Sequence, residues 1–424
     1  MNFINKNNLF NSLPDEWPQD LLPLIRKKIR NATYKIIILD DDPTGTQTVH
    51  NLPVLTHWSA EALADELVRE FPAFFLLTNS RSLTTQAACS LAEEIGRNLL
   101  AAEKKTGIRT VLISRSDSTL RGHFPDEVDA MAKIMGKAHL PYLVLPFFLE
   151  GGRYTINDIH YVQEDESLIP AAETPFAKDA AFGFSNSNLK GWIEEKTGGK
   201  ISAEQVISIC LEDIRTGGPA KVTQILRTVP ERGACFANAA SYRDMEVIVT
   251  ALAEVEAEGK EFLYRTAASF VRTRTGMESK TKLLDRTSLL NTNIASGGIF
   301  VIGSYVEKTC KQIDALFTQT DIRQLEIQVS RLLDPIEQKS EIRRISFEMN
   351  HALKACKDVA IYTSRTLVTG ADGAESLSIG KIVSDSLVEV VKNLELKPRY
   401  LIAKGGITSS DVATKGLGVK RAMV

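Results

Sequence analysis

Residues 35–50, KIIILDDDPTGTQTVH, run four apolar residues into three consecutive aspartates, followed by a proline, a glycine and several hydroxyl side chains. The apolar run predicts a buried strand, so the acids stand where that strand ends. Neighbouring carboxylates repel one another and lose solvation when they are covered. They therefore indicate either a polar turn or a site in which a cation or a polar ligand balances them. Ligands bind at the carboxyl ends of strands in open α/β sheets, which favours a site.

A phosphatase is one chemistry that this stretch fits. The spacing Asp40-x-Asp42-x-Thr44 matches an aspartyl nucleophile followed by a carboxylate that serves as acid and base. That chemistry also needs a lysine and a further acidic pair that holds magnesium at a later strand end. No later strand finishes in two carboxylates. The phosphatase therefore stays open as an incomplete alternative.

Length, charge and cysteine use narrow the class of protein. A chain of 424 residues favours two domains over a single core. The formal net charge of -2 gives no basic surface for nucleic acid or an anionic membrane. No apolar run reaches membrane-spanning length, and the N-terminus lacks a signal-peptide pattern. The cysteines and histidines are scattered without metal-ligand spacing, so we expect a reduced, cytoplasmic protein without a zinc site.

The order of apolar runs predicts an α/β fold with two domains and mainly parallel sheets. After a short amphipathic helix within 18–32, strand-like runs of about five residues alternate with helical periods. Residues 149–197, rich in Gly, Asn, Asp and Thr, are expected to be irregular and to serve as a functional segment or lid. From the helix that follows Gly303 to Asp358, the second domain is expected to be helical.

The domain boundaries follow from composition. We place an N-terminal domain at 1–272, which includes a helical extension at 1–32, and a polar linker at 273–297. A second α/β domain occupies 298–424, and its last residues, KRAMV, resemble the start of a strand.

Three turns in the second half share one design, in which small or hydroxyl residues stand between a strand and a helix. They are Gly303-Ser304, Thr363-Ser364 and Gly405-Gly406. A helix N-terminus offers unpaired N–H groups to phosphate oxygens, and glycine lets the backbone approach closely. Thr408 either caps the last helix or offers its hydroxyl to a phosphate. Because neither the Walker lysine pattern nor G-x-G-x-x-G occurs, a P-loop enzyme and a dehydrogenase are both unsupported.

Two turns in the first half add anion-binding residues to the aspartates. One carries Asn79, Ser80, Arg81 and Ser82, and the other carries Arg115, Asp117, Ser118, Thr119 and Arg121. A guanidinium binds a carboxylate through two hydrogen bonds, while hydroxyls and carboxylates suit a polyol. We therefore expect a pocket for a small acid that carries hydroxyl groups. From the irregular segment, Lys178 and Asp179 are secondary candidates, and a structural role is favoured for His160.

These stretches carry a family resemblance. Together, LDDDPTGTQTV, TNSRSL, SRSDSTLRGH, PFFLEGGRYT, GSYVEKTCKQI and IAKGGITSSDVA resemble the four-carbon acid sugar kinase family, from Lys35 to Val424. The resemblance implies a substrate domain followed by a nucleotide domain, with the reaction in the cleft between them. It implies that ATP phosphorylates a sugar acid such as threonate, erythronate or a 3-oxo-tetronate.

The resemblance also assigns residues by position. On the substrate side it places the turn from Asp40 to Thr44, together with Arg81, Arg115, Asp117 and Arg121, and on the ATP side Ser304, Ser364, Gly380, Gly405 and Gly406. This chain has Ile407 where many relatives carry an acidic residue after the glycine pair. Members usually continue past KRAMV, so an incomplete nucleotide domain is expected if the protein ends there.

The roles expected under this hypothesis are specific. Arg81 or Arg115 holds the substrate carboxylate, Asp42 orients or deprotonates the attacking hydroxyl, and Asp41 binds Mg²⁺ directly or through water. The partners would be a sugar acid and ATP, with no nucleic acid and no membrane, and a homodimer is left open. A non-enzymatic effector or binding protein is the remaining alternative.

Overall fold

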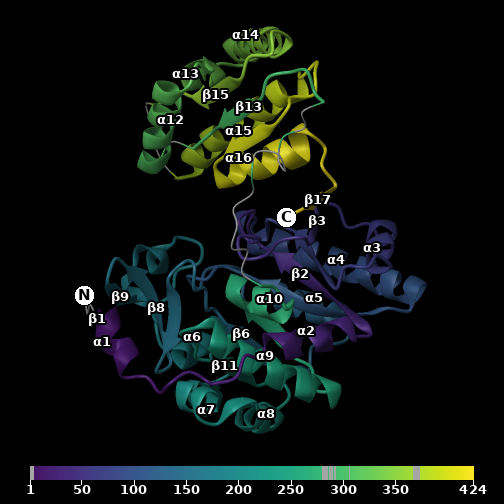
Figure 1. Cartoon of the computed structure of the whole chain (residues 1–424), viewed down its shortest axis with the longest axis vertical. Helices are drawn as coiled ribbons and strands as arrows, with labels where there is room; N and C mark the ends of the chain where they lie inside the picture. The colour runs from purple at the N-terminus through teal and green to yellow at the C-terminus, as the bar shows by residue number, and fades with distance from the viewer. Residues whose placement is uncertain (1–3, 279–284, 286–289, 291–292, 305, 366–372) are drawn as a thin grey trace. The chain divides into compact units, whose positions relative to one another are not determined.

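The chain folds into two compact units in the computed structural model, which describes residues 4–278, 285, 290, 293–304, 306–365 and 373–424. Unit 1 comprises Met1–Ser279 and Arg421–Val424, and unit 2 comprises Lys280–Lys420 (Figure 1). Both units contain mainly parallel sheets with helices, which confirms the predicted α/β class. The linker expected at 273–297 lies in part outside the described residues. Across the described parts of the chain, no helix combines the length and apolar character needed to cross a membrane.

The large sheet of unit 1 is parallel except at one edge. Its order is β10-β11-β6-β12-β5-β2-β4-β3-β17, and only the last pair, β17 with β3, is antiparallel. In that order the strands are β10 (Ile207–Ile209), β11 (Ala234–Ala237), β6 (Tyr142–Leu145), β12 (Leu263–Thr266), β5 (Arg109–Arg115), β2 (Tyr34–Asp40), β4 (Ala73–Leu77), β3 (Pro53–Leu55) and β17 (Arg421–Met423).

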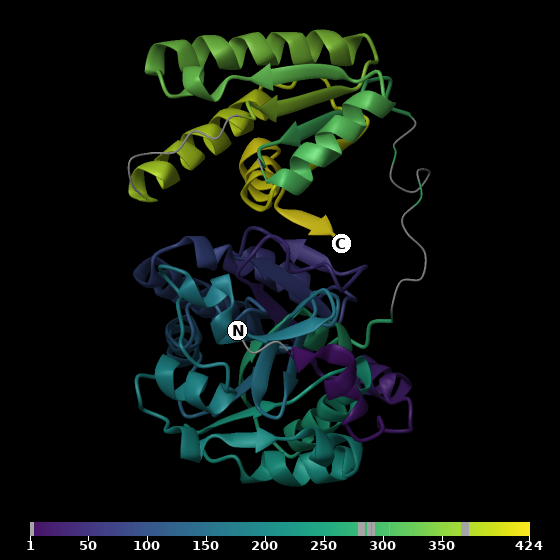
Figure 2. The same ribbon diagram turned by 90° about the vertical axis from the view of Figure 1, so that its left-hand side faces the viewer.

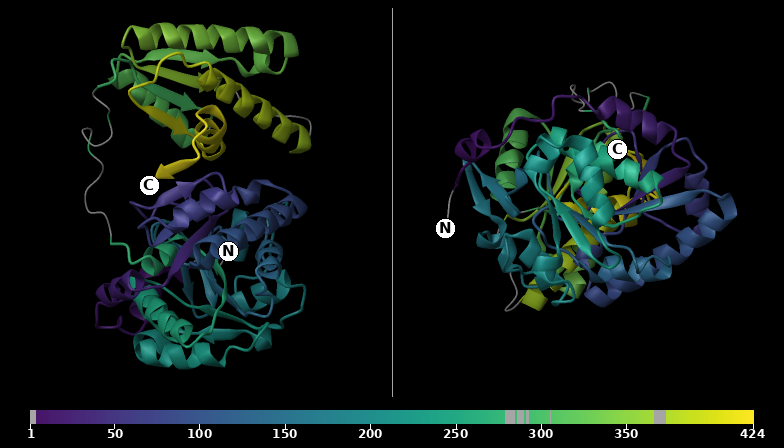
Figure 3. Two further views of the ribbon diagram at one scale, coloured as in Figure 1. Left: turned by 90° about the vertical axis from the view of Figure 1, so that its right-hand side faces the viewer. Right: turned by 90° about the horizontal axis from the view of Figure 1, so that it is seen from below.

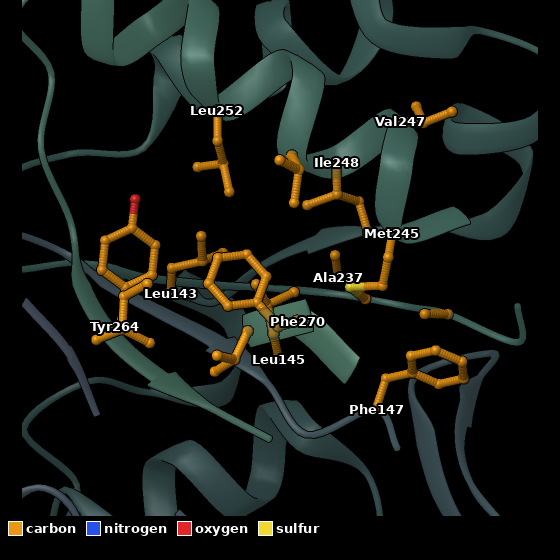
Figure 4. Packing of buried hydrophobic residues seen from close by; sticks show 14 of the residues in the cluster. Leu143, Leu145, Phe147, Ala237, Met245, Val247, Ile248, Leu252, Tyr264 and Phe270 are labelled. Atoms are coloured by element: carbon orange, nitrogen blue, oxygen red, sulfur yellow. The ribbon is translucent and has the colours of Figure 1, made fainter. Parts of the chain in front are cut away.

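Helices cover both faces of this sheet, as near-continuous apolar strands require. Successive side chains of β2 alternate between two apolar cores: Ile36 and Ile38 belong to one, Ile37 and Leu39 to the other. The first core includes α2 (Leu22–Arg30), α7 (Leu211–Arg215), α8 (Gly218–Thr228), α9 (Tyr242–Ala257) and α10 (Ala268–Arg274), and the second α3 (Ala60–Leu67), α4 (Thr85–Thr106) and α5 (Asp126–Ile134). Figure 4 shows Ile248 and Leu252 of α9 above Leu143 and Leu145 of β6. The expected helix within 18–32 is α2.

The segment expected to be irregular, residues 149–197, contributes three strands to a small antiparallel sheet, so the prediction of an irregular segment was wrong. Its order is β1-β9-β8-β7, from β1 (Ile4–Asn5), β9 (Ser167–Pro170), β8 (Ile159–Glu164) and β7 (Arg153–Ile156). Asn157 and Asp158 both have positive φ and form the two-residue turn between β7 and β8. Asn and Asp are typical of tight hairpin turns. Because the segment was judged by its overall composition, this turn signal was missed. Two short helices, α1 (Lys6–Asn11) and α6 (Leu189–Lys196), follow β1 and β9 in the chain.

Unit 2 has a parallel sheet of order β14-β15-β13-β16. Its strands are β14 (Arg323–Ile327), β15 (Val359–Thr363), β13 (Ile299–Ile302) and β16 (Leu401–Lys404), and its helices are α12 (Glu307–Gln319), α13 (Val329–Leu332), α14 (Pro335–Lys354), α15 (Gly373–Lys392) and α16 (Gly406–Asp411). α14 lies alongside β14 and β15 (Figures 2 and 3). β14 corrects the expectation of an uninterrupted helical stretch up to Asp358. It is an edge strand that buries only Leu325 and Ile327, so its apolar signal is weak.

The last strand, β17, belongs to the sheet of unit 1. It pairs antiparallel with β3, and Arg421 forms an ion pair with Glu66 of α3, at 2.8 Å from Nε to Oε2 and 3.1 Å from Nη2 to Oε1. Glu66 is only 2% exposed, and its other cation, Arg69, is half-exposed and lies at 3.4 Å. A strand was expected at KRAMV, but its sheet partner could not be predicted from the local sequence.

Replacing Arg421 with alanine is expected to destabilise unit 1, because it leaves the buried Glu66 carboxylate with one distant partner. Loss of charged hydrogen bonds to a buried group costs about 1–3 kcal/mol. The free energy of unfolding, measured by urea denaturation, should fall by that amount, whereas Arg69→Ala should change it by under about 1 kcal/mol. Equal effects of the two variants would contradict the bidentate pair.

Candidate functional site

The acidic turn, the Arg81 turn and the Arg115 loop leave three neighbouring strands at the same edge of the unit-1 sheet. β4, β2 and β5 run parallel, and Asp40 lies opposite Leu77 of β4 and Arg115 of β5. The turn after β4 is the 3₁₀ helix η1 (Ser80–Ser82). This edge therefore carries all the predicted substrate-side residues: Asp40, Asp41, Asp42, Thr44, Arg81, Ser82, Arg115, Asp117, Ser118 and Arg121.

Asp40 and Asp41 are buried carboxylates that face guanidinium groups. Arg115 Nη1 lies 3.2 Å from Asp40 Oδ1 and 3.8 Å from Asp41 Oδ1, and Arg81 Nη1 lies 3.9 Å from Asp41 Oδ1. Burial raises the pKa of Asp40 to about 7 and also raises the pKa of Asp41, although both arginines oppose the shift. Asp40 Oδ2 and Asp41 Oδ1 accept no hydrogen bond from the described residues. The Asp40 carboxyl can therefore exchange a proton near neutral pH, and the raised pKa of Asp41 means that it keeps its proton to a higher pH than an ordinary aspartate.

Two glycines let the backbone approach these carboxylates. A Cβ atom on Gly45 would lie 2.0 Å from Asp40 Oδ1, so only glycine fits where the turn folds over Asp40. Gly122 has a φ of +119°, and a Cβ there would lie 3.3 Å from Asp41 Oδ2. Asp40, predicted to contact substrate, is thus fully buried beneath its own turn.

Asp42 and Asp117 are engaged with neighbours. Asp42 Oδ1 accepts hydrogen bonds from the amide of Thr44, at 2.7 Å, and from its hydroxyl, while Oδ2 pairs with Arg81. Asp117 pairs with Arg121 Nε at 2.7 Å and with Arg81 Nη1 at 3.6 Å. Burial acts to raise the pKa of Asp117, but these two arginines outweigh it and lower that pKa to about 2. We call Asp40, Asp41, Asp42 and Asp117 the acidic cluster.

The predicted hydroxyl groups differ in accessibility. Thr44 and Ser82 are exposed, although the Ser82 hydroxyl donates to the carbonyl of Asn79 at 2.8 Å. Ser118 is buried, and its carbonyl accepts a hydrogen bond from His160. Of the secondary candidates, Asp179 reaches Arg121 at 3.4 Å. His160 is fully buried with both ring nitrogens hydrogen-bonded, which agrees with the structural role favoured for it.

Glu127 and His123 also lie by the cluster; neither was predicted as a site residue, although His123 ends the motif SRSDSTLRGH. Burial raises the pKa of Glu127 to about 8; a hydrogen bond with Ser80 opposes that shift, and the Asp41 charge adds to it. His123 is buried, and its Nε2 lies 3.1 Å from the carbonyl oxygens of both Ser80 and Leu83. Glu127 belongs to α5, and a glutamate is an ordinary residue at a polar position of a helix. Only the tertiary structure places it beside the site.

The Mg²⁺ role expected for Asp41 stays a prediction. Among the described residues, no group of three or more His, Cys, Asp or Glu side chains could hold a metal ion. The positive charge that Mg²⁺ would supply comes from Arg81 and Arg115, whose guanidinium groups lie within 4 Å of Asp41. The acids are therefore balanced by arginines from adjacent turns.

The three predicted phosphate turns follow adjacent strands of unit 2. β15, β13 and β16 are parallel neighbours, so their carboxyl ends lie at one edge. A Cβ on Gly303 would lie 2.2 Å from Thr408 Oγ1, and one on Gly405, whose φ is +113°, would lie 3.3 Å from Ser304 Cβ. Arg365, which the sequence did not single out, donates to the Ser304 carbonyl at 2.8 Å and to Thr363 Oγ1 at 2.7 Å. The turns thus contact one another directly or through Arg365.

The remaining nucleotide-side predictions fall in different places. Ser364 contacts the end of β14, since its amide donates to the carbonyl of Ile327 at 3.1 Å, and its Oγ accepts from the amide of Val329, the first residue of α13, at 3.3 Å. Gly406 begins α16. Gly380 lies inside α15, exposed and with open space around it, so it belongs to none of the three turns. Its role in nucleotide binding stays a prediction.

Comparison with known proteins agrees with this division into units. Residues 36–274 match the family model of a sugar-binding N-terminal domain, and residues 299–424 match that of a nucleotide-binding C-terminal domain. The chain belongs to the four-carbon acid sugar kinase family. It is 24% identical over 328 residues to a D-erythronate kinase of Heliobacterium modesticaldum, covering 74% of this chain and 67% of that protein.

Solved structures share the fold of this family member. A Salmonella typhimurium LT2 protein, provisionally named a tRNA synthase, has a TM-score of 0.66 at 15% identity. A Haemophilus influenzae protein has a TM-score of 0.63 at 14% identity. Each match covers 92% of this chain and 90% of the other.

Stability is expected to fall with rising pH in part because of Glu127. Its pKa in the folded state, about 8, exceeds the ordinary glutamate value of 4.5, so folding retains a proton that the unfolded chain releases. Glu127→Gln should match the wild type at pH 4 and become progressively more stable than it up to pH 8. Urea midpoints across this range test the difference. The exposed Glu204→Gln serves as control, and profiles parallel to the wild type would contradict the raised pKa of Glu127.

Gly45→Ala is expected to disrupt the acidic turn, because the new methyl group would overlap the Asp40 carboxylate. Overpacking of this kind costs about 1–3 kcal/mol and displaces the neighbouring groups. Thermal unfolding should report a lower Tm. Gly380→Ala, in an open helical position, should keep or slightly raise the Tm. An unchanged Tm for Gly45→Ala would contradict the close approach.

Proposed function

We propose that this family member is an ATP-dependent kinase that phosphorylates a hydroxyl group of a four-carbon sugar acid such as erythronate. The observation that carries the proposal is the acidic cluster, in which four carboxylates and the guanidinium groups of Arg81, Arg115 and Arg121 meet at one sheet edge. Carboxylates accept hydrogen bonds from hydroxyl groups, and an accessible guanidinium binds a carboxylate. The sugar-binding family model and the erythronate kinase relative support this class of substrate.

Arg81 is the better candidate to bind the substrate carboxylate. Its side chain is 20% exposed and lies among three aspartates, whereas Arg115 is 5% exposed and pairs with Asp40 and Asp41. A ligand reaches Arg81 without displacing Arg115. We assign to Arg115 the task of holding the two buried carboxylates in place.

Asp41 is the better candidate to accept the proton of the attacking hydroxyl. Both oxygens of Asp42, which the sequence favoured, are occupied by Thr44 and Arg81. The buried Oδ1 of Asp41 accepts no hydrogen bond from the described residues, and burial raises the pKa of Asp41 above the ordinary value. A carboxylate with a raised pKa is the stronger base at neutral pH.

The nucleotide is assigned to unit 2, through the turns formed by Ser304, Gly405 and Thr408. The nucleotide-binding family model and the contacts among these turns support that assignment. ATP, when bound, supplies the phosphoryl group and its charge, which the chain must position more than react with. Glycine at 405 has positive φ and gives a phosphate oxygen close access to the backbone.

The aspartyl-phosphatase alternative is disfavoured by the position of Asp40. A nucleophile must reach phosphorus, but the side chain of Asp40 is 1% exposed, covered by the Gly45 backbone and paired with Arg115. A binding protein without activity is separated from a kinase by turnover alone.

The test is a turnover assay on the purified full chain. ADP formation should require ATP, Mg²⁺ and a four-carbon sugar acid, with erythronate, threonate and 3-oxo-tetronates assayed in parallel. Phosphate release from phosphorylated sugar acids without ATP would favour the phosphatase. Binding of a sugar acid without ADP formation would favour a binding protein.

Asp41→Asn should leave the fold intact and lower kcat by about 10²–10⁴-fold, because the amide cannot accept the hydroxyl proton. Asp42→Asn is the matched control and should have a smaller effect on kcat, since Asp42 holds the turn. Steady-state kinetics with erythronate and ATP measure both. A larger loss of kcat for Asp42→Asn would return the role of base to Asp42.

A further inference from the structure

The loop after β5, residues 116–123, carries Asp117 and Arg121 in an irregular conformation. Leu120 has a φ of +70° and Gly122 a φ of +119°, so the backbone twice enters the left-handed region. For leucine that region is unfavourable, and the surrounding structure must enforce it. Because Asp117 belongs to the acidic cluster, the contacts that hold this loop also fix part of the geometry of the cluster.

Buried side chains hold three carbonyl groups of this loop. Arg265 of β12 donates from Nη2 to the carbonyl of Asp117 at 2.8 Å and to that of Arg121 at 3.1 Å. His160 Nε2 lies 2.7 Å from the carbonyl of Ser118, and its Nδ1 lies 2.9 Å from Thr155 Oγ1. Arg265 thus bridges the two ends of the turn on which Asp117 and Arg121 stand.

Burying the charge of Arg265 in this position costs free energy. Arg265 is fully buried, its guanidinium lies over the Trp192 ring at 5.3 Å, and its Nε and Nη1 have no hydrogen-bond partner among the described residues. Within that part of the chain no carboxylate lies within ion-pair distance of it. Its nearest compensating charges, Asp117 and Asp41, act at longer range. A buried charge without a direct partner is destabilising, so a stability role alone does not account for it.

A second buried arginine in the same unit shows the contrast. Arg274 of α10 is 2% exposed, but it pairs with Glu256 and reaches the hydroxyl of Tyr34 at 3.1 Å. A direct ion pair compensates its charge. No described contact links it to the 116–123 loop. Arg274 is therefore a matched control for burial and charge without a role at the site.

We propose that Arg265 is a positioning residue for the sugar-acid site, which fixes the 116–123 loop and supplies positive charge beneath Asp41 and Asp117. Its effect on substrate rests on the proposed function, whereas its effect on the loop does not. Two hydrogen bonds from one guanidinium nitrogen set the distance between the Asp117 and Arg121 carbonyls. The same arrangement directs both side chains to pair with each other, at 2.7 Å.

The test compares Arg265→Met, Arg265→Lys and Arg274→Met in the full chain. Hydrogen exchange of the amides in 116–123 measures the loop without any ligand. Arg265→Met should raise that exchange about tenfold or more, Arg265→Lys should restore part of the protection, and Arg274→Met should leave the loop unchanged while lowering the Tm. If Arg265→Met does not fold, Arg265→Lys alone decides the outcome. Wild-type exchange in the loop of a folded Arg265 variant would overturn the proposal.

Calorimetric titration with erythronate and with ATP–Mg²⁺ separates this proposal from the function. Arg265→Met should weaken erythronate binding about tenfold or more and leave ATP affinity within about twofold, since Arg265 lies in unit 1. Arg274→Met should keep the erythronate affinity of its folded fraction. Equal erythronate affinity in Arg265→Met and the wild type would overturn the assigned role at the site. If the wild type itself binds no four-carbon sugar acid, the proposed function fails, and loop exchange still decides whether Arg265 positions the loop.

Discussion

The pairing of carboxylates with guanidinium groups across neighbouring strands is the interaction on which unit 1 depends. Asp40 ends one strand and Arg115 ends the next, and the register of β2 and β5 sets them opposite each other. Three consecutive aspartates at a strand end would otherwise repel one another and lose solvation together. The parallel sheet solves this because arginines from adjacent turns arrive at the same edge. The acidic cluster is therefore a product of topology as much as of composition.

Close backbone approach is the second condition for this arrangement. The turn folds over Asp40 because residue 45 has no side chain, and the loop after β5 nears Asp41 at Gly122. Burial then raises the pKa values of Asp40 and Asp41 despite the arginines. The result is a pair of charge-compensated carboxyls whose pKa values both lie above the ordinary value of an aspartate, that of Asp40 at about 7. Such groups are uncommon outside functional sites.

A compensated acidic cluster suits an anionic polyol. Arginines already neutralise the acids, so a ligand that brings hydroxyl donors and one carboxylate can bind without a large net charge being buried. Unit 2 complements this with turns that meet at the carboxyl edge of their own sheet, where Gly303 and Gly405 approach Thr408 and Ser304. Membership in the four-carbon acid sugar kinase family agrees with one unit for the sugar acid and another for the nucleotide.

By itself the sequence determined the α/β class and the family, and it identified which strand ends carry polar residues, because these depend on local periodicity and on contiguous motifs. It concealed the small sheet within 149–197 and the edge strand β14, whose signals are a two-residue turn and two buried side chains. Only the tertiary structure decided that Asp40 and Asp41 are both buried, each with one oxygen that accepts no hydrogen bond from the described residues, and that Glu127, Arg265 and Arg365 stand beside the predicted turns. The reason is physical. Burial, hydrogen bonding and charge compensation are properties of residues far apart in the chain, and no local pattern records which of them meet.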